Sequence, residues 1–322
     1  MALPSLTKTI DDYFLSTWYE IRPEAIDNIL KATPVWAALK AAGCMTSQVG
    51  GEYITRTVKY ATSGVTKEIA KGDTLGQGEP ELETMAMWTW RYLSTHVQRS
   101  LLDDQKNNGK FKIKSLVQTR LQDANDTLVQ KYETEALKAI VTDETGKGIQ
   151  GLNDLLPSYA NRATGTYGKI SRSNTWWQAN YKQLTTPIAV NLVSDMNNLY
   201  NTCYNGQTPP NLILTTQALY ETYSDFALDM SQIVKDTGGQ LVDLGFEVQR
   251  FRGKPMIWSP NVTAGDMMFL NTKFIEVVYD PNLWFDMTEW KVLPLQTERI
   301  AHIICACNIV GAQPRRHGLL YT

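Results

Sequence analysis

The sequence predicts an α+β fold, and three patterns along its 322 residues indicate it. Apolar residues recur at every second position over 53–62 and 81–93, which is typical of half-buried strands. They recur every three or four positions over 106–141, which is typical of a long amphipathic helix. Helical and strand patterns then alternate from 150 to 285, and the remaining residues return to the period of strands.

Residues 1–45 predict short helices in an N-terminal arm. Pro23 and Pro34 interrupt the helical pattern, and Gly43 ends it. The apolar residues of the segment have no clear partner within it, namely Ile26, Ile29, Leu30, Val35, Trp36 and Leu39. We therefore expect this segment to reach out from the body of the subunit.

Residues 46–105 predict an extended β-hairpin with glycines near its tip. In the first strand Ile54 and Val58 share a face with Arg56, so that face mixes apolar and charged residues. Neither strand of the hairpin has enough apolar residues on a single face to build a core. An isolated two-stranded ribbon is marginal in water, and a long exposed edge invites pairing with another chain. We therefore expect a neighbouring subunit to cover the hairpin.

The charged residues near the hairpin tip allow two interpretations. They are Lys67, Glu68, Lys71, Asp73, Glu79 and Glu81. They could form a solvated tip, or they could pair with charges of a neighbouring subunit, where complementarity fixes register more than it adds affinity. Both interpretations stay open at this point.

The helix predicted over 106–141 is unusually long for a compact enzyme of this size. Its stripe consists of Ile113, Val117, Leu121, Ala124, Leu128, Tyr132, Ala136 and Ile140. At about 1.5 Å per residue it would form a rod of roughly 40 Å. Downstream we expect a helix over 185–204 with Ile188, Leu192, Met196 and Leu199 on one stripe, a helix over 216–228, a buried strand over 211–215, and further strands to the C-terminus.

Composition excludes several classes of function. With 31 basic and 33 acidic residues, the net charge of −2 gives no electrostatic reason to grip nucleic acid or an anionic membrane. No run of 18 apolar residues exists, and the N-terminus lacks the pattern of a secretion signal. The four cysteines are too scattered for a disulfide scaffold, so we expect buried, reduced thiols.

The residues that could support catalysis are few. The chain has three histidines, His96, His302 and His317, and it lacks both a nucleophile elbow and a phosphate-binding loop. A zinc site at His302, Cys305 and Cys307 is disfavoured, because alternation on a strand places the histidine on the opposite face from the cysteines. We predict no enzyme activity, metal or cofactor.

The order of these elements resembles the major capsid proteins of tailed bacteriophages, whose fold is the Hong Kong 97 type. Five short stretches carry the resemblance: NTWWQANY at 174–181, NLILTTQALYETY at 211–223, FRGKPMIWSP at 251–260, MMFLNTKFIEV at 267–277 and NIVGAQPRRHGLLY at 308–321. Each stretch is short and degenerate, so the specificity lies in their order along nearly the whole chain.

The resemblance implies a domain for each segment. These are an N-terminal arm at 1–45, an extended loop at 46–105, a peripheral domain with its spine helix at 106–149, an axial domain at 150–283, peripheral strands at 284–310 and a return to the axial domain at 311–322. The charged tip residues, Trp88 and Trp90 would lie at subunit interfaces. Asp236, Gly238 and Gly239 would lie in a loop at the capsomer axis.

The function that the resemblance implies is structural. Hexamers and pentamers of a major capsid protein would form an icosahedral virion shell, assembled in the host cytoplasm, around double-stranded DNA that is a non-specific neighbour. Because the arm begins near Met1, a separate scaffolding protein is expected, together with a portal protein; a decoration protein stays open. Two alternatives remain: an encapsulin-like cellular compartment shell, and a two-domain enzyme that uses His302 with a cysteine or a carboxylate.

Overall fold

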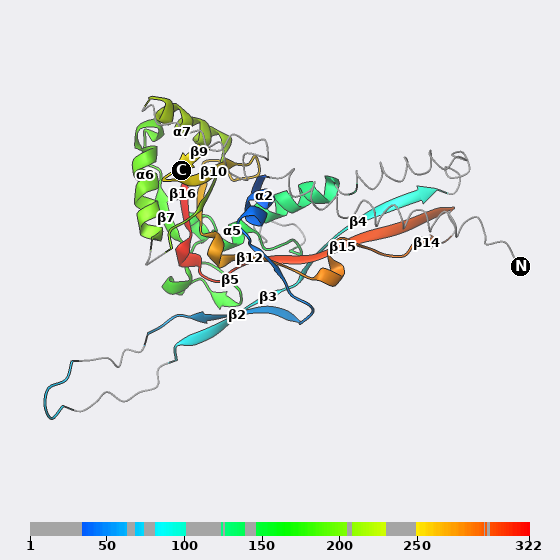
Figure 1. Ribbon diagram of the computed structural model, residues 1–322, viewed down its shortest axis with the longest axis horizontal. Helices are drawn as coiled ribbons and strands as arrows, with labels where there is room; N and C mark the ends of the chain where they lie inside the picture. Colours follow the sequence, from blue (N-terminus) through cyan, green and yellow to red (C-terminus); the bar gives the residue numbers. More distant parts are fainter. Residues whose placement is uncertain are drawn as a thin grey trace, which may run out of the picture.

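In the structure, a computed structural model, two ribbons project from the body in different directions (Figure 1). The structure describes residues 34–62, 68–73, 81–100, 124, 126–138, 146–204, 208–229, 249–292, 294 and 297–322. Two six-stranded sheets organise the body, and two-stranded ladders flank them. The mixture of sheets and helices is the α+β class that the sequence predicted.

One six-stranded sheet forms the wider end of the body (Figure 1). Its strand order is β7 (Asn180–Gln183), β16 (Gly318–Tyr321), β11 (Met267–Leu270), β8 (Leu212–Thr215), β10 (Lys254–Trp258) and β9 (Gln249–Phe251). Helices α6 (Ile188–Cys203) and α7 (Gln217–Asp229) flank it. The predicted helices and the buried strand at 211–215 are thereby confirmed.

Apolar side chains of this sheet are buried on both of its faces. In β8, Ile213 joins the cluster under α6, whereas Leu212 and Leu214 join the main core on the other side. This two-sided burial explains why β8 and β11 are continuous apolar runs and do not alternate. The stripe of α6 packs as predicted, because Leu192 and Met196 are both buried in the first cluster.

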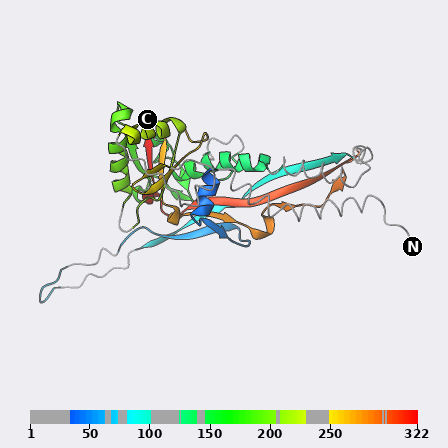
Figure 2. The ribbon, with the colours of Figure 1, turned by 45° about the horizontal axis from the view of Figure 1, so that its top comes forward.

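The second sheet is built around β15 (Glu298–Gly311), which is the longest of the described strands and pairs with most of the others. Four of its strands are hydrogen-bonded in the order β1 (Met45–Ser47), β12 (Ile275–Tyr279), β15 and β13 (Asp286–Met287). The other two strands, β4 (Arg91–Ser100) and β14 (Lys291–Val292), also pair with β15. The part of β15 that pairs with β4 and β14 runs out of the body as one of the two ribbons (Figures 1 and 2).

Two segments lie elsewhere than the predicted domains placed them. β12 was assigned to the axial segment ending at 283, but it pairs with β15, so the chain changes sheets at η5 (Thr272–Phe274). β4 was assigned to the extended hairpin, but it pairs with β15 along ten residues. Strand periodicity predicts that a segment is a strand, but it does not identify the partner strand.

Shorter elements complete the described chain. They are α5 (Leu152–Leu155), β5 (Thr166–Tyr167), β6 (Ile170–Ser171), and the 3-10 turns η2 (Tyr159–Asn161), η3 (Thr175–Trp177), η6 (Pro281–Leu283) and η7 (Pro314–Arg316). Within the described parts of the chain, no helix is long and apolar enough to cross a membrane.

The long helix is described over 126–137, and the remainder of the predicted span 106–141 lies outside the described residues except for Ala124 and Lys138. Its predicted stripe is buried where it can be observed, at Ala124, Leu128, Tyr132 and Ala136. The helix packs into the main core together with α5, β15 and the first described helix of the chain.

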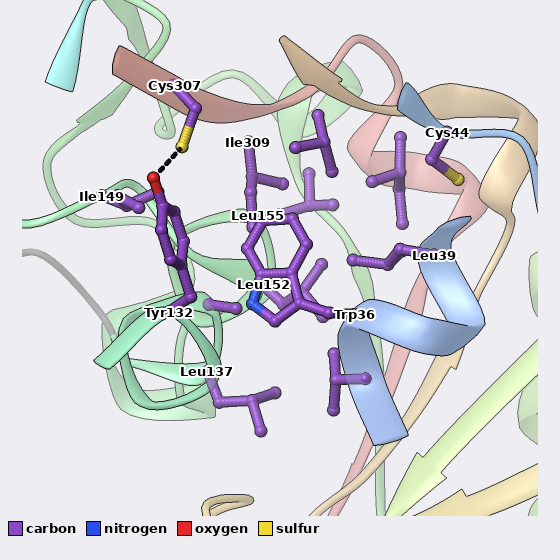
Figure 3. Packing of buried hydrophobic residues seen from close by; sticks show 14 of the residues in the cluster. Trp36, Leu39, Cys44, Tyr132, Leu137, Ile149, Leu152, Leu155, Cys307 and Ile309 are labelled. Carbon is purple, nitrogen blue, oxygen red and sulfur yellow. Dashed lines mark hydrogen bonds between the residues drawn. The ribbon is translucent and has the colours of Figure 1, made fainter. Parts of the chain in front are cut away.

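That first helix, α2 (Pro34–Ala41), corrects the sequence prediction for the end of the arm. Val35, Trp36 and Leu39 were expected to lack partners, but all three are buried in the core of their own chain. The Trp36 ring meets the Tyr132 ring edge to face, with centroids 5.4 Å apart (Figure 3). The partners come from residues about a hundred positions away, which the local pattern could not show. Residues 1–33 lie outside the described chain.

A buried carboxyl group of the long helix lies close to the first residues of α2. The Glu133 side chain lies in the core, and the Ser259 hydroxyl donates to its Oε1 at 3.1 Å. Burial raises the pKa of this carboxyl to about 7, against the opposing effects of the Ser259 hydroxyl and of the nearby Val35 and Trp36 backbone N–H groups. The group therefore binds a proton more tightly in the folded chain than in the unfolded one.

This linkage predicts how stability depends on pH. Because the folded pKa is raised, the contribution of Glu133 is fully present below its unfolded pKa of about 4.5 and is lost as the pH rises toward about 7. A shift of this size corresponds to roughly 3 kcal/mol. Glu133→Gln should therefore be more stable than the natural chain at pH 8, with the difference disappearing near pH 5. Urea unfolding at both pH values checks this, and an equal difference at both would contradict it.

Candidate assembly surface

The β2–β3 ribbon is the candidate functional surface, because it leaves the body and ends far from it (Figures 1 and 2). Strand β2 (Tyr53–Lys59) pairs antiparallel with β3 (Glu83–Thr89), in a register that runs from Tyr53 opposite Thr89 to Lys59 opposite Glu83. The hairpin itself is the one predicted from the alternating pattern. The described turn at its far end spans residues 68–73.

The inner face of the ribbon base packs against its own chain. Its buried residues are Ile54, Val58, Ala86 and Trp88. The Trp88 ring, 1% exposed, meets the Tyr167 ring at a steep angle with centroids 5.6 Å apart. The Met87 backbone N–H donates to the Gly168 carbonyl at 3.0 Å. The β5–β6 hairpin thus seats the ribbon on the body.

Gly168 is required for this close approach. Its φ of +58° lies in the left-handed region, and an added Cβ would lie 2.8 Å from Cζ2 of Trp88. A side chain at position 168 would therefore meet both backbone strain and a steric clash with the indole ring.

Polar and aromatic contacts fix the ribbon on either side of Trp88. The Arg56 guanidinium forms an ion pair with Glu276 of β12, with Nε donating to Oε2 at 3.0 Å. The Tyr60 ring stacks on Trp176 with centroids 5.0 Å apart. The Lys169 ammonium lies 3.7 Å from the centroid of the Tyr53 ring. These contacts set the angle at which the ribbon leaves the body.

Two predicted interface residues therefore have a different role. Trp88 is buried in its own chain, so its side chain is not available to a neighbouring subunit. Trp90 is half-buried against the same core, and its indole N–H donates to the Gly51 carbonyl at 2.7 Å. The expectation that another subunit completes the core of the hairpin is wrong at the base, because the β5–β6 segment covers it.

The tip residues lie where an interface could form. Glu68, Lys71 and Asp73 are exposed, and so is Glu81 further down the ribbon. Asp73 closes the turn, since its Oδ2 accepts from the Ala70 backbone N–H at 2.7 Å. Lys67 and Glu79 lie outside the described residues, as do Asp236, Gly238 and Gly239 of the predicted axis loop.

Sequence reasoning did not identify the exposed apolar residues of the ribbon as an interaction surface. Ile69 at the tip is 58% exposed, and Met85 on the outer face is 53% exposed. Near Met85 the outer face also presents Thr55, Thr57 and Lys59, which are exposed. The ribbon therefore offers a mixed apolar and charged surface, which is typical of interfaces between separately folded subunits.

The residues considered for chemistry do not form one site. The four cysteines are buried and form no disulfide bond, and burial raises the pKa of the Cys44 thiol to about 11 and of the Cys203 thiol to about 12. Cys305 and Cys307 face the core while His302 is exposed, as strand alternation predicted. His317 is buried, and its Nδ1 accepts from the Asn271 backbone N–H at 3.1 Å.

One sizeable cavity, of about 860 Å³, lies beside the long helix and α5. Arg172 and Asp154 line it from buried positions, and the Arg172 guanidinium is bonded to the carbonyls of Asp154 and Thr164. Burial raises the pKa of Asp266 at its edge to about 6. His302, on which the enzyme alternative depended, does not line this cavity.

Comparison with known proteins identifies the fold. No protein-family model matches the chain, and no curated protein matches it. A chain of the cyanophage A-1(L) capsid asymmetric unit is similar, with 18% identity, a TM-score of 0.63, and coverage of 88% of this chain and 91% of that one. A chain of Microbacterium phage Oxtober96 is 10% identical with a TM-score of 0.53, covering 87% and 90% of the two chains.

A third similar structure is that of an encapsulin. The holo-SrpI encapsulin complex from Synechococcus elongatus PCC 7942 contains a chain with 11% identity and a TM-score of 0.51, covering 86% of this chain and 84% of that one. Together these likenesses confirm the predicted fold: the chain has the Hong Kong 97-type capsid fold. At these identities the likenesses show the fold alone.

The close contact between Gly168 and Trp88 predicts that a methyl group added at position 168 destabilises the chain. Gly168→Ala should lower the free energy of unfolding by roughly 2–4 kcal/mol, from left-handed strain and overpacking against Trp88. Gly50→Ala is the matched control, because Gly50 has a similar φ of +64° but nothing within 4 Å of an added Cβ. Denaturant unfolding of both variants checks this. Equal losses would show that the contact with Trp88 contributes nothing.

Proposed function

We propose that the chain is the major capsid protein of a tailed bacteriophage, a structural subunit without catalytic activity. The capsid fold supports this proposal. The observation that carries it is the β2–β3 ribbon, which is anchored at its base but extends its tip far from the body (Figure 1). A ribbon of this kind is stable in an aqueous environment only if another surface covers its far end.

In this proposal the segments take the roles that the resemblance implied. The β2–β3 ribbon is the extended loop, and the helix that includes 126–137 is the spine of the peripheral domain. The sheet of β7 to β16, with α6 and α7, is the axial domain. The tip contacts the adjacent copy through Glu68, Lys71, Asp73 and the exposed Ile69, together with Lys67, Glu79 and Glu81. The loop with Asp236, Gly238 and Gly239 lies at the capsomer axis.

Assembly then follows from repetition of modest contacts. Hexamers and pentamers are closed rings, in which each subunit gives one ribbon and receives another. Many weak interfaces sum to a stable shell, and weak single contacts allow misplaced subunits to leave. The net charge of −2 suits a wall beside packaged DNA, because a strongly positive lining would bind the genome. A scaffolding protein, a portal and assembly in the host cytoplasm belong to the same proposal.

The second candidate is an encapsulin-like compartment shell, which the similarity to the SrpI encapsulin complex favours. The two candidates share the ribbon and differ in their contents. Particles purified from the natural source distinguish them, because a phage capsid protects double-stranded DNA from nuclease whereas a compartment shell retains a protein cargo.

Deleting Val65–Pro80 tests the ribbon as the assembly element. The shortened chain should stay soluble and unfold at an unchanged denaturant concentration, because the segment lies beyond the anchored base. It should form no closed shells in negative-stain electron micrographs under conditions in which the natural chain does. The Gly50→Ala chain serves as an assembly-competent control. Shells of normal size from the deleted chain would reject the proposed role.

A further inference from the structure

Two of the three histidines of the chain face each other across the projecting ribbon of β4 and β15. His96 on β4 is directly opposite His302 on β15, and both side chains are exposed. Their ring centroids lie 6.4 Å apart, with the ring planes at 57°. The proposed shell function does not use this pair.

The strand register places the two side chains at the closest kind of cross-strand position. The backbone N–H of His302 donates to the Thr288 hydroxyl at 3.0 Å, and its carbonyl accepts from the Thr288 N–H at 2.8 Å. Both backbone groups of His302 therefore point away from β4. The His96 and His302 pair is thus a non-hydrogen-bonded pair of the antiparallel ladder, with Cα atoms about 4.5 Å apart in the ideal geometry.

Imidazole is the preferred protein ligand for late first-row metal ions, which it binds at about 2.0–2.1 Å. Two imidazoles on one such ion hold their ring centroids roughly 5–6 Å apart. The observed separation of 6.4 Å is close to that span. Since both side chains are exposed, small rotations of their rings would bring one nitrogen of each onto a shared ion.

We propose that His96 and His302 form a two-imidazole binding site for a divalent transition-metal ion of the Zn²⁺, Ni²⁺ and Cu²⁺ class. Water completes the coordination, because the described residues contain no group of three or more His, Cys, Asp or Glu side chains that could hold a metal. Cys305 and Cys307 do not contribute, since they face the core.

A bound ion would join β4 to β15 in the ribbon that leaves the body (Figures 1 and 2). Residues opposite one another in a ladder stabilise it through their side chains, and a metal bridge is a stronger connection than an apolar pair. An ion that binds the folded chain and not the unfolded one raises stability with its concentration. The site therefore couples metal availability to the rigidity of this ribbon. This inference stands or falls independently of the shell function.

Zinc binding by the full-length chain without a histidine tag tests the proposal. Isothermal titration with Zn²⁺ at pH 7.5 should give one ion per chain, and His96→Asn and His302→Asn should each weaken binding at least tenfold. The double variant should lose little more than either single one, because removing one ligand already destroys the chelate.

Controls separate metal binding from folding. Ser94→Ala changes an exposed neighbour on the same face of β4 and should leave Zn²⁺ affinity unchanged. In the presence of EDTA all variants should unfold at the same temperature as the natural chain, because both histidines are exposed. Saturating Zn²⁺ should raise the unfolding temperature of the natural chain and of Ser94→Ala alone. Unchanged affinity in both single histidine variants, or no saturable binding by the natural chain, would overturn the site.

Discussion

Fixing the base of the β2–β3 ribbon is the constraint on which the candidate assembly surface depends. Two strands alone have one hydrogen-bonded ladder and little area to bury, so their direction in space would otherwise be undefined. Here Trp88 fills the space above Gly168, and the ion pair of Arg56 with Glu276 attaches the same ribbon to β12. The ribbon base thereby becomes part of the body, and its contacts fix the direction in which β2 and β3 leave it.

A defined direction matters because repeated contacts require repeated geometry. A subunit in a closed ring meets its neighbour at one angle, and a freely moving arm would lose ordering entropy at each contact. An arm that is fixed at its base loses less conformational entropy when it binds, so a small surface at its end is enough to form the contact. The mixed character of that surface, with Ile69 beside charged residues, fits contacts that must also be reversible while a shell grows.

Local patterns in the sequence predicted the elements but not their partners. The stripe of α6, the buried run of β8 and the opposite orientation of Cys305 and His302 follow from periodicity alone, and all were confirmed. The burial of Trp36 and Trp88 could not be predicted, because the residues that cover them lie tens of positions away or more. Arg56 shares the apolar face of its strand, and nothing in the pattern identified Glu276 as its partner.

The burial of α2 and the burial of the ribbon base, both of which sequence reasoning missed, have a common physical cause. At each of them, a segment from the first ninety residues packs an aromatic ring against the body and lies beside a partly or fully buried acid, Glu133 or Glu276. An apolar surface alone would permit several orientations of a short helix or ribbon. A buried carboxylate costs desolvation energy unless its donors are correctly placed, so it penalises every orientation except one. Glu133 and Glu276 therefore lower stability somewhat, and in return they restrict each segment to one orientation. A single orientation is the property that the proposed shell subunit needs.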